Sequence, residues 1–510
     1  MNDTVFLSRE RRQALLAALI GAAVATWVIF LNHGYINSDG LVYIESAKQF
    51  SLGNWQQGLS VYNWPFYSLI IATIHQTTGL GLLDAAHVIT IFAFALLAAG
   101  LPLLVRELGG NHRVQMFSVL MLIGATPLVE NYLPMVIRDH GFLAAHVWSL
   151  VFLLRFFRSN SLYDALAWNA IATLATLFRI EGIVYFILLP LLNLFRKDHS
   201  TKENIIDLVK ANAFLIVGMT LLITALYFIP HFDLQHLGRL GDPVNIAQKV
   251  LHQINDGLNN KADSYGTILG PFLDDYAMQG LILTLACILV VKSLSSVGIA
   301  QLLLSISLWK RHHEYGLKAN NLIFLSLLSA ICIINATCIL ISSFALPKRY
   351  LQPLGLVIIV LASFSFYIML DDWKRGKGKR WILPILSTIL AVQIALNLKP
   401  VDPRNRSEQE AAQWIHEHLP SGSKIYYDYG RVRYYVEGDS SSRHLVPWDE
   451  IERLISSDDI IHYDYLVVHI PKKDYHREQV LENRFGKPLA TFENKRGKRI
   501  SIYQIQPINP

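Results

Sequence analysis

Residues 14–31 read ALLAALIGAAVATWVIFL, an uncharged apolar run directly after Arg9, Arg11 and Arg12. About 20 predominantly apolar residues are enough for a helix to cross the hydrocarbon core of a bilayer. The backbone of such a segment must satisfy its hydrogen bonds internally, so the run is predicted to be a helix. Basic residues before it indicate an uncleaved first span whose N-terminus is cytoplasmic.

The composition extends this prediction to most of the chain. Of 510 residues, 52% are hydrophobic and only 16% are charged, whereas a soluble domain carries about 25% charged residues. The net charge of +6 comes from basic residues in short segments between apolar runs, which argues against nucleic acid as a partner. Cys287, Cys332 and Cys338 lie inside apolar runs and have neither a disulfide pattern nor a metal-ligand spacing.

Further apolar runs predict a polytopic helical bundle of about 11–13 spans. They are residues 83–105, 114–129, 141–157, 163–178, 181–195, 211–230, 276–309, 320–346, 351–370 and 381–396.

Two segments decide the threading of this bundle. Residues 65–78 are short and polar enough for a re-entrant or interfacial helix, and residues 276–309 are too long for one straight span. Taking the first as interfacial and the second as a single crossing places the basic loops on one side. About eleven spans result, and the loops 32–64, 130–140 and 231–275 then lie on the outer face, as does the C-terminus.

The texture of the sequence changes after Lys399, where Pro400 and Pro403 mark a linker. Residues 1–399 are therefore predicted to form the membrane domain, and residues 400–510 a small soluble α/β domain outside the membrane. Hydrophobic periodicity predicts helices over 408–419, 448–457 and 475–484, strands over 424–429 and 465–470, and a final hairpin around Gly497.

Charged residues in short outer loops are candidates for function. Asp39 lies just beyond the first span, in a motif that ends at Tyr43, a candidate supporting residue. Its carboxylate could act as a general base or hold a cation. In the alternative interpretation, Ser38 or Asp39 caps a helix that begins near Leu41.

A second group is Arg138-Asp139-His140, which could bind an anionic group or a metal, or in which Asp139 could simply cap the next helix. Arg179 and Glu181 lie between two apolar runs, where a structural ion pair is the alternative to a role at the site.

The fourth group is Lys348-Arg349-Tyr350, followed by Pro353 at the start of a late span. A guanidinium at a helix entrance suits bidentate binding of a phosphate. Interfacial Lys, Arg and Tyr are also ordinary membrane anchors.

The order of these elements resembles the C-type (GT-C) glycosyltransferase superfamily, which includes bacterial aminoarabinose transferases and protein O-mannosyltransferases. The elements are the acidic loop at Asp39, the helix opened by Trp64-Pro65-Phe66-Tyr67, the second acidic loop at Asp139, the Arg349-Tyr350-x-x-Pro353 element and the soluble tail. The resemblance implies a membrane enzyme that transfers a hexosyl or pentosyl group from a polyprenyl-phosphate-linked donor. It also implies an envelope glycan, lipid or protein acceptor, and a bacterial inner membrane with the tail in the periplasm.

The same resemblance assigns roles. Asp39 corresponds to the base or metal-site residue, Asp139 to the second acidic position, and Arg349 to the residue that contacts the donor phosphate, with Arg138, His140, Lys348 and Tyr350 beside them. Many members of the superfamily have a paired acid in the first loop, whereas Gly40 follows Asp39 here. This departure leaves dependence on a divalent cation (Mg²⁺ or Mn²⁺, with Asp39 and Asp139 as candidate ligands) open.

Two other functions remain compatible with the sequence. A transporter or flippase of lipid-linked saccharides predicts ionisable residues at the bilayer midplane and broken helices in related halves; Lys292, in a long apolar stretch, is the one residue of that kind. A polysaccharide polymerase or ligase predicts key residues in a large late outer loop. The 231–275 loop, with Asp233, His236, Arg239 and Asp242, is of that type.

Overall fold

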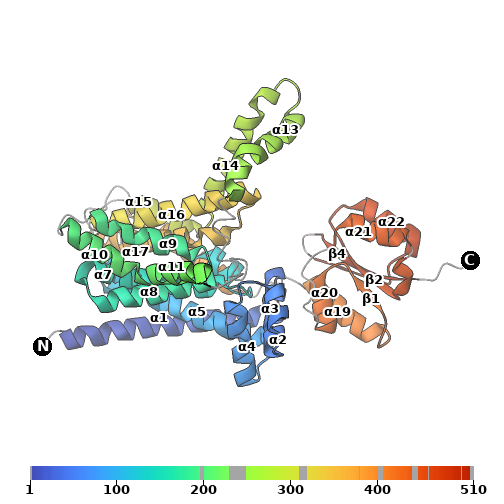
Figure 1. Cartoon of the computed structure of the whole chain (residues 1–510), viewed down its shortest axis with the longest axis horizontal. Helices are drawn as coiled ribbons and strands as arrows, with labels where there is room; N and C mark the ends of the chain where they lie inside the picture. Colours follow the sequence, from blue (N-terminus) through green and yellow to red (C-terminus); the bar gives the residue numbers. More distant parts are fainter. Residues whose placement is uncertain are drawn as a thin grey trace, which may run out of the picture. The chain divides into compact units, whose positions relative to one another are not determined.

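The computed structural model describes residues 3–195, 200–228, 248–308, 317, 319–377, 379–399, 406–438, 446–457, 459–494 and 497–505. The chain forms two compact units, coloured by sequence position in Figure 1. Unit 1 comprises Met1–Val28, Val88–Pro134 and Arg138–Lys399, and unit 2 comprises Ile29–His87, Met135–Ile137 and Pro400–Pro510. The first outer loop therefore belongs to the same compact unit as the soluble tail, a grouping that the division at residue 399 did not anticipate.

Apolar helices make up most of unit 1. In the described part of the chain, six helices are long and apolar enough to cross a membrane, one bent pair could form a further span, and four shorter apolar helices accompany them. These elements are α1 (Asp3–Leu31), α5 (Leu82–Glu107), α6 (His112–Ile123), α7 (Asp139–Ser159), α8 (Leu162–Phe178), α9 (Gly182–Leu188), η2 (Leu189–Phe195), α10 (Thr201–Ala211), α11 (Ala213–Phe228), α14 (Ala277–Leu294), α16 (Ala319–Ser343), α17 (Gln352–Lys374) and α18 (Ile382–Leu398).

The structure shows what form the two ambiguous segments, residues 65–78 and 276–309, take. Residues 65–78 form α4 (Phe66–Thr78), a helix of 13 residues that packs on α2 (Ser38–Ser51) and is too short to span, as predicted. Residues 276–309 are not one continuous helix, and only their first part, within Asp274–Leu294, is a candidate span. A turn separates α14 from α15 (Ile299–Leu308), and Lys292 lies in the last turn of α14 rather than at mid-helix.

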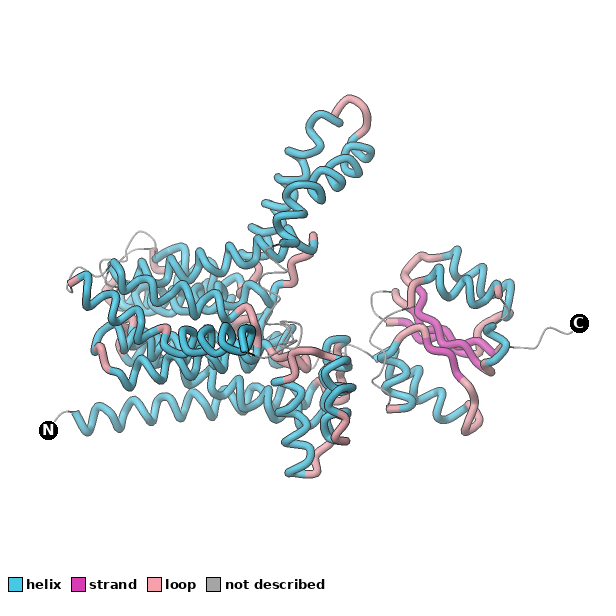
Figure 2. The backbone as a smooth tube through the Cα atoms, in the orientation of Figure 1, coloured by secondary structure: helices cyan, strands magenta, loops and turns pink. Residues whose placement is uncertain are grey.

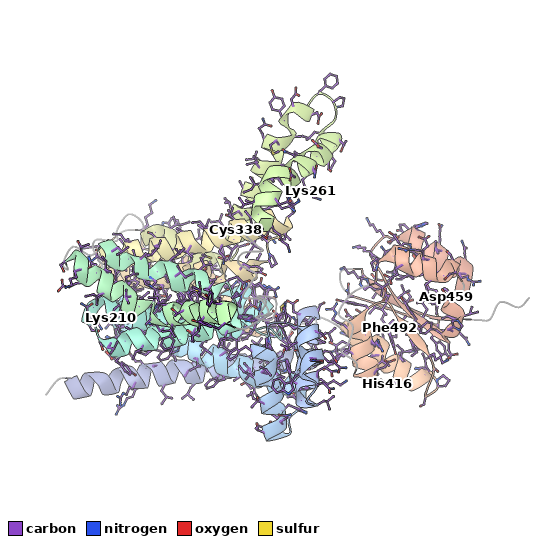
Figure 3. All side chains as sticks on the ribbon, in the orientation of Figure 1. Lys210, Lys261, Cys338, His416, Asp459 and Phe492 are labelled. Carbon is purple, nitrogen blue, oxygen red and sulfur yellow. The ribbon has the colours of Figure 1, made fainter. Side chains whose placement is uncertain are left out.

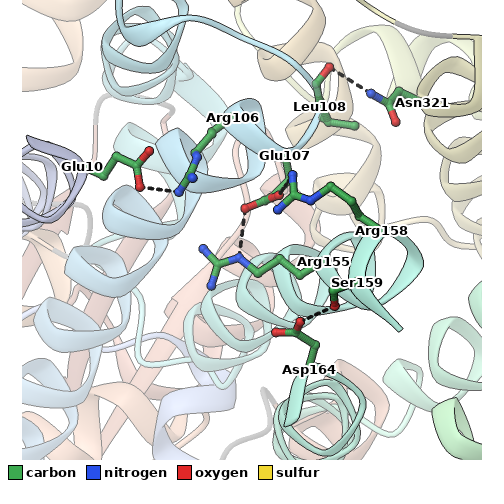
Figure 4. Close-up of polar contacts among 9 residues, drawn as sticks. All are labelled: Glu10, Arg106, Glu107, Leu108, Arg155, Arg158, Ser159, Asp164 and Asn321. Carbon is green, nitrogen blue, oxygen red and sulfur yellow. Dashed lines mark hydrogen bonds and ion pairs between the residues drawn. The ribbon is translucent and has the colours of Figure 1, made fainter. Parts of the chain in front are cut away.

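An ion-pair network joins several helix ends in unit 1 (Figure 4). The Glu107 carboxylate at the end of α5 has a side chain only 1% exposed and pairs with Arg155 and Arg158 of α7, each at 2.9 Å. Arg106 pairs with Glu10 of α1, and Asn321 of α16 donates a hydrogen bond to the Leu108 carbonyl at 3.0 Å. All of these residues come from segments predicted to be cytoplasmic, or next to them.

Unit 2 contains a helical part and a mixed α/β part. The helical part is α2, α3 (Trp55–Val61) and α4. The α/β part consists of α19 (Arg406–His418), β1 (Ile425–Tyr427), α20 (Gly430–Glu437), α21 (Trp448–Ser456), β2 (Tyr465–Ile470), α22 (Tyr475–Phe485), β3 (Ala490–Glu493) and β4 (Arg499–Gln504). Every helix and strand predicted from the sequence of the tail is present, whereas α20 was not anticipated.

The strands, magenta in Figure 2, form one sheet. Its order is β1-β2-β4-β3, with β1 and β2 parallel and the other pairs antiparallel. Side chains alternate across the faces of a strand. Leu466, Val468 and Ile470 of β2 therefore pack with α21 and α22, whereas Val467 faces α19. Phe492 of β3, labelled in Figure 3, packs against the same cluster of buried side chains as Val467.

Candidate active site

A tight turn between α8 and α9 places Arg179 and Glu181 side by side. Helix α8 ends because Arg179 is extended (φ −142°), and the Gly182 N–H donates to the Arg179 carbonyl at 2.8 Å. A Cβ at Gly182 would lie 3.1 Å from backbone atoms of Thr176, so the turn packs too closely on α8 to accept a side chain easily.

The Arg179 guanidinium is buried and holds two carboxylates. Its Nη1 donates to Asp139 Oδ1, and its Nε and Nη2 each lie 3.3 Å from an oxygen of Glu181. Burial by itself lowers the pKa of Arg179, but Asp139 and Glu181 raise it well above its usual value. Burial likewise acts to raise the pKa of Glu181, but Arg179 and Arg138 outweigh this effect and lower it to about 2. Arg179 and Glu181 are therefore both charged at neutral pH.

Asp139 is the first residue of α7, and the N-cap of this helix is Arg138. The alternative interpretation of Asp139 as a helix cap is therefore wrong, because its carboxylate is bound by Arg179. Arg138 is only 7% exposed. A His140 ring nitrogen lies 3.0 Å from the Tyr132 carbonyl oxygen, which fixes the ring against the preceding turn.

Tyr350 connects this cluster to the late Arg-Tyr element. The Arg179 guanidinium carbon lies 4.4 Å from the centre of the Tyr350 ring, and that of Arg349 lies 5.7 Å from the same centre. Such contacts are cation–π interactions. Lys348, Arg349 and Tyr350 form the half-buried 3₁₀ turn η7 (Lys348–Leu351) that opens α17.

Tyr132 also belongs to the cluster and was missed in the sequence, where a tyrosine in an outer loop gives no distinct signal. Its side chain lies in the electrostatic field of Asp139, Arg349 and Arg179. Burial, together with the Asp139 charge, raises the pKa of Tyr132 to about 12 despite the opposing effect of Arg349. The phenol is therefore neutral at neutral pH.

The structure thus assembles one cluster within unit 1 from residues far apart in the sequence. It consists of Tyr132, Arg138, Asp139, Arg179, Glu181, Arg349 and Tyr350. Lys348 is adjacent in the chain, and His140 follows Asp139. Asp39 and Tyr43 belong to unit 2.

Asp39 lies in the first turn of α2, whose N-cap is Asn37. The capping alternative is therefore wrong for both Ser38 and Asp39. Asn37 accepts a hydrogen bond from the Val136 N–H at 2.8 Å instead of capping α2. A Cβ at Gly40 would lie 3.0 Å from Asn37 Oδ1 and 3.1 Å from Val136, so the structure leaves little room for a second carboxylate there.

Tyr43 has a packing role. Its ring, 5% exposed, makes edge contacts with the rings of Tyr62 and Tyr67 at 5.1 and 5.2 Å. These contacts join α2 to the start of α4, and they account for the burial of Tyr43.

The segment that carries Asp39 is held by the soluble tail within unit 2. The Tyr429 hydroxyl lies 3.2 Å from the Ser38 hydroxyl, and the Ile36 N–H donates to the Tyr435 hydroxyl at 3.2 Å. Arg431 lies over the Tyr429 ring at 4.5 Å and pairs with Glu408 at 2.7 Å. Sequence reasoning missed these residues because it missed α20.

The positions of the carboxylates show whether the site suits a divalent cation. Among the described residues there is no group of three or more His, Cys, Asp or Glu side chains arranged to hold a metal ion. Asp139, one of the two candidate ligands, is instead neutralised by Arg179. The residues of the unit 1 cluster therefore suit an anion better than a metal ion.

Comparison with solved structures supports the fold. The chain is similar to the oligosaccharyltransferase of Archaeoglobus fulgidus, crystallised with Zn and sulfate (11% identity, TM-score 0.53, covering 97% of this chain and 74% of that one). ArnT from Cupriavidus metallidurans in the apo state gives 11% identity and a TM-score of 0.48, covering 96% and 97%. The arabinofuranosyltransferase AftD from Mycobacteria gives 14% identity and 0.48, covering 98% of this chain and 40% of that one.

No protein-family model matches the sequence, and no curated protein is significantly similar to it. The likeness to the archaeal oligosaccharyltransferase, the only one of the three with a TM-score above 0.5, therefore concerns the fold alone. In architecture, the chain has the GT-C fold that its sequence resemblance implied.

Proposed function

We propose that this protein is a membrane glycosyltransferase that uses a polyprenyl-phosphate-linked sugar. The sugar would be transferred to an envelope glycan, lipid or protein at the outer face of a bacterial inner membrane. The GT-C fold supports this class of activity, and the predicted threading supports the sidedness.

The observation that carries the proposal is the buried cationic cluster of unit 1. Arg179 is shared between Asp139 and Glu181, while Arg138 and Arg349 lie close to the same groups. Three guanidinium groups and two carboxylates therefore lie together in a largely buried place. Guanidinium groups bind phosphate oxygens through charge-assisted hydrogen bonds, which suits this group of side chains to the phosphate of a lipid-linked donor.

The proposed reaction is a displacement at the anomeric carbon. The bond between this carbon and the phosphate oxygen breaks, a bond to the acceptor hydroxyl oxygen forms, and the acceptor proton passes to a base. Polyprenyl phosphate leaves with the bonding electron pair. Arg349, with Arg138 and Lys348 beside it in the proposal, would stabilise the negative charge on that leaving group.

Asp39 is proposed as the base. A positioned carboxylate that takes the acceptor proton typically contributes about a hundredfold to ten-thousandfold in rate. Asp39 belongs to unit 2 and Arg349 to unit 1, so the role proposed for each residue is tested by a separate variant. No step is assigned to a metal ion, since Asp139 is engaged by Arg179.

The test is a comparison of cells with and without the gene. Mass spectrometry of their glycolipids, polysaccharides and glycoproteins should show one species that lacks a single sugar when the gene is absent, together with accumulation of the lipid-linked donor. Unchanged glycans combined with altered uptake of a solute would overturn the proposal in favour of a transporter.

The transporter alternative finds limited support in the structure. Helices Thr201–Ala211 and Ala213–Thr224 are bent by 65° at their junction, the one such pair in the described part of the chain. Transporters of the inverted-repeat type have discontinuous helices in corresponding positions of two halves. The residues proposed for a polymerase or ligase, Asp233, His236, Arg239 and Asp242, lie outside the described residues.

A further inference from the structure

A small pocket lies between α15, α17 and α18 of unit 1, away from the cluster around Arg179. Its volume is about 190 Å³. Pockets that enclose drug-sized ligands have volumes of about 300–1,000 Å³, so this pocket suits a smaller group. Its lining residues are Ser307, Ser365, Ile368, Met369, Asp372, Trp373, Lys377, Lys379, Arg380, Ile382 and Leu383.

The inner part of the pocket is mainly apolar. Ile368 and Leu383 are 3% and 7% exposed, and Met369 lies beside them in the lining. The hydroxyls of Ser307 and Ser365 are hydrogen-bonded to each other, so their polar atoms are already satisfied. Such a wall is compatible with the glycerol backbone and first methylenes of a lipid, whereas it offers few groups to a sugar or a nucleobase.

The mouth of the pocket is cationic. Lys377, Lys379 and Arg380 are exposed, and within the described chain none of the three side chains pairs with a carboxylate. The neighbouring Arg375, in contrast, is paired with Asp371 at 2.9 Å. Three cationic side chains and one carboxylate, that of Asp372, therefore line the pocket.

Two tryptophans indicate the depth of this mouth in the membrane. Trp373 at the end of α17 and Trp381 just before α18 are 45% and 60% exposed. Exposed tryptophans concentrate at the level of the lipid headgroups. α17 belongs to a candidate span, Lys348–Lys374, and α18 is one of the shorter apolar helices, so the cations between them lie at one end of an apolar helix pair.

From this arrangement we propose that the pocket is a binding site for the headgroup of an anionic glycerophospholipid. The lipid phosphate lies among Lys377, Lys379 and Arg380, and the upper part of an acyl chain lies along Met369 and Leu383. Basic pockets between transmembrane helices bind anionic headgroups on the same physical grounds. This lipid site does not depend on the proposed glycosyl transfer, so the two proposals are tested separately.

The test uses the purified full-length protein and native mass spectrometry. Phosphatidylglycerol is titrated against the wild type, the Lys377→Gln/Lys379→Gln/Arg380→Gln variant and a matched control. Phosphatidylcholine, which has no net charge, and inorganic phosphate serve as comparison ligands. The control, Arg11→Gln/Arg12→Gln/Arg113→Gln, also removes three exposed charges from segments predicted to lie on the same side, but none of them lines the pocket.

We expect one phosphatidylglycerol to bind the wild type more tightly than phosphatidylcholine does. Each cation near an anionic headgroup is worth about fivefold in affinity, so the triple pocket variant should lose about a hundredfold, and the control less than about fivefold. Equal losses in both variants, or equal affinity for the two lipids, would overturn the proposal. Binding of inorganic phosphate as tightly as phosphatidylglycerol would also overturn it, by showing that the site takes a soluble anion.

Discussion

The Tyr429 hydroxyl lies 3.2 Å from the Ser38 hydroxyl, joining residues 391 positions apart in the chain. Tyr429 immediately precedes α20 of the soluble tail, and Ser38 immediately precedes Asp39. The Arg431 guanidinium lies over the Tyr429 ring and pairs with Glu408. The tail therefore fixes the start of the helix on which the proposed base is carried.

This contact predicts energetic coupling between the two side chains. A hydrogen bond between neutral groups contributes about 0.5–1.5 kcal/mol net, so Ser38→Ala and Tyr429→Phe should each lower the melting temperature slightly. In a double-mutant cycle the effects should be non-additive, because either change alone removes the bond. Thermal unfolding of the wild type, the two single variants and the double variant in one detergent measures this coupling. Ser38→Ala combined with Tyr463→Phe, a tyrosine that packs on Tyr426 instead, should be additive.

Asp39→Asn tests the proposed base. The amide keeps the size of the carboxylate but cannot take a proton, so transfer should fall about a hundredfold to ten-thousandfold while the protein remains folded and inserted. The matched control is Glu45→Gln on the same helix, where the carboxylate accepts a hydrogen bond from Gln49 at 2.7 Å. Near-normal turnover of Asp39→Asn, or an equal loss in the control, would refute the assignment.

Arg349 and Arg179 should differ in what their loss changes. Hydrogen bonds to charged groups contribute about 1.5–3 kcal/mol, so Arg349→Gln should weaken use of the donor about tenfold to a hundredfold with little effect on the melting temperature. Arg179→Gln leaves both Asp139 and Glu181 without their common partner, and should destabilise the protein strongly.

The two effects are separated by measuring donor kinetics and thermal unfolding for each variant. Arg375→Gln serves as a control for the removal of one charge, since Arg375 is paired with Asp371 elsewhere in unit 1. If Arg349→Gln left the KM and kcat for the donor unchanged, the role assigned to Arg349 would be wrong.

The Glu107 network in Figure 4 predicts a purely structural effect. Glu107→Gln weakens two ion pairs at once, and losing one partner of a buried pair costs about 3–5 kcal/mol. Arg158 is largely exposed and can be solvated, so the loss of unfolding free energy should lie at or below the lower end of this range. The melting temperature should drop while activity per folded molecule is unchanged. Asp164→Asn, which removes the charge of an exposed carboxylate that accepts a hydrogen bond from Ser159 but keeps an acceptor oxygen, should change neither.

Asp428 predicts a dependence of stability on pH. Burial raises the pKa of this carboxyl from 3.8 to about 7, although the His469 backbone N–H, which donates to it at 2.6 Å, acts in the opposite direction. Between these two pH values the Asp428 carboxyl is ionised in the unfolded chain and neutral in the folded one. Folding therefore binds a proton, and the stabilising contribution of this group declines as the pH rises through about 7.

The variant Asp428→Asn cannot ionise, yet it keeps an oxygen that can accept the His469 N–H. The melting temperature of the variant minus that of the wild type should therefore increase from about pH 4.5 to about pH 8. Thermal unfolding scans of both full-length proteins measure this difference. A difference that stays constant or falls over this range would show that Asp428 is ionised in the folded protein.

The comparison of sequence and structure separates two kinds of information. Apolar run length and the charges between runs predicted most of the apolar helices of unit 1, because a bilayer imposes these constraints locally on each segment. They did not predict α10 or the helix Leu258–Leu269, which lie in stretches expected to be loops. Strand β2 begins and ends at the predicted residues 465 and 470, because its alternating burial is visible in the sequence. The α20 helix was missed because its eight residues are too few for a clear helical period.

For the site, the sequence determined which residues carry charge and at which helix ends they lie, since Asp39, Asp139, Arg179 and Arg349 all stand at the borders of apolar runs. Only the tertiary structure decided what each charge contacts. It assigned the Asp139 carboxylate to Arg179 rather than to a helix cap, and it added Tyr132 and Tyr429, which no local pattern distinguishes. The physical reason is that apolarity acts on each segment alone, whereas an ion pair or hydrogen bond depends on which distant segments pack together.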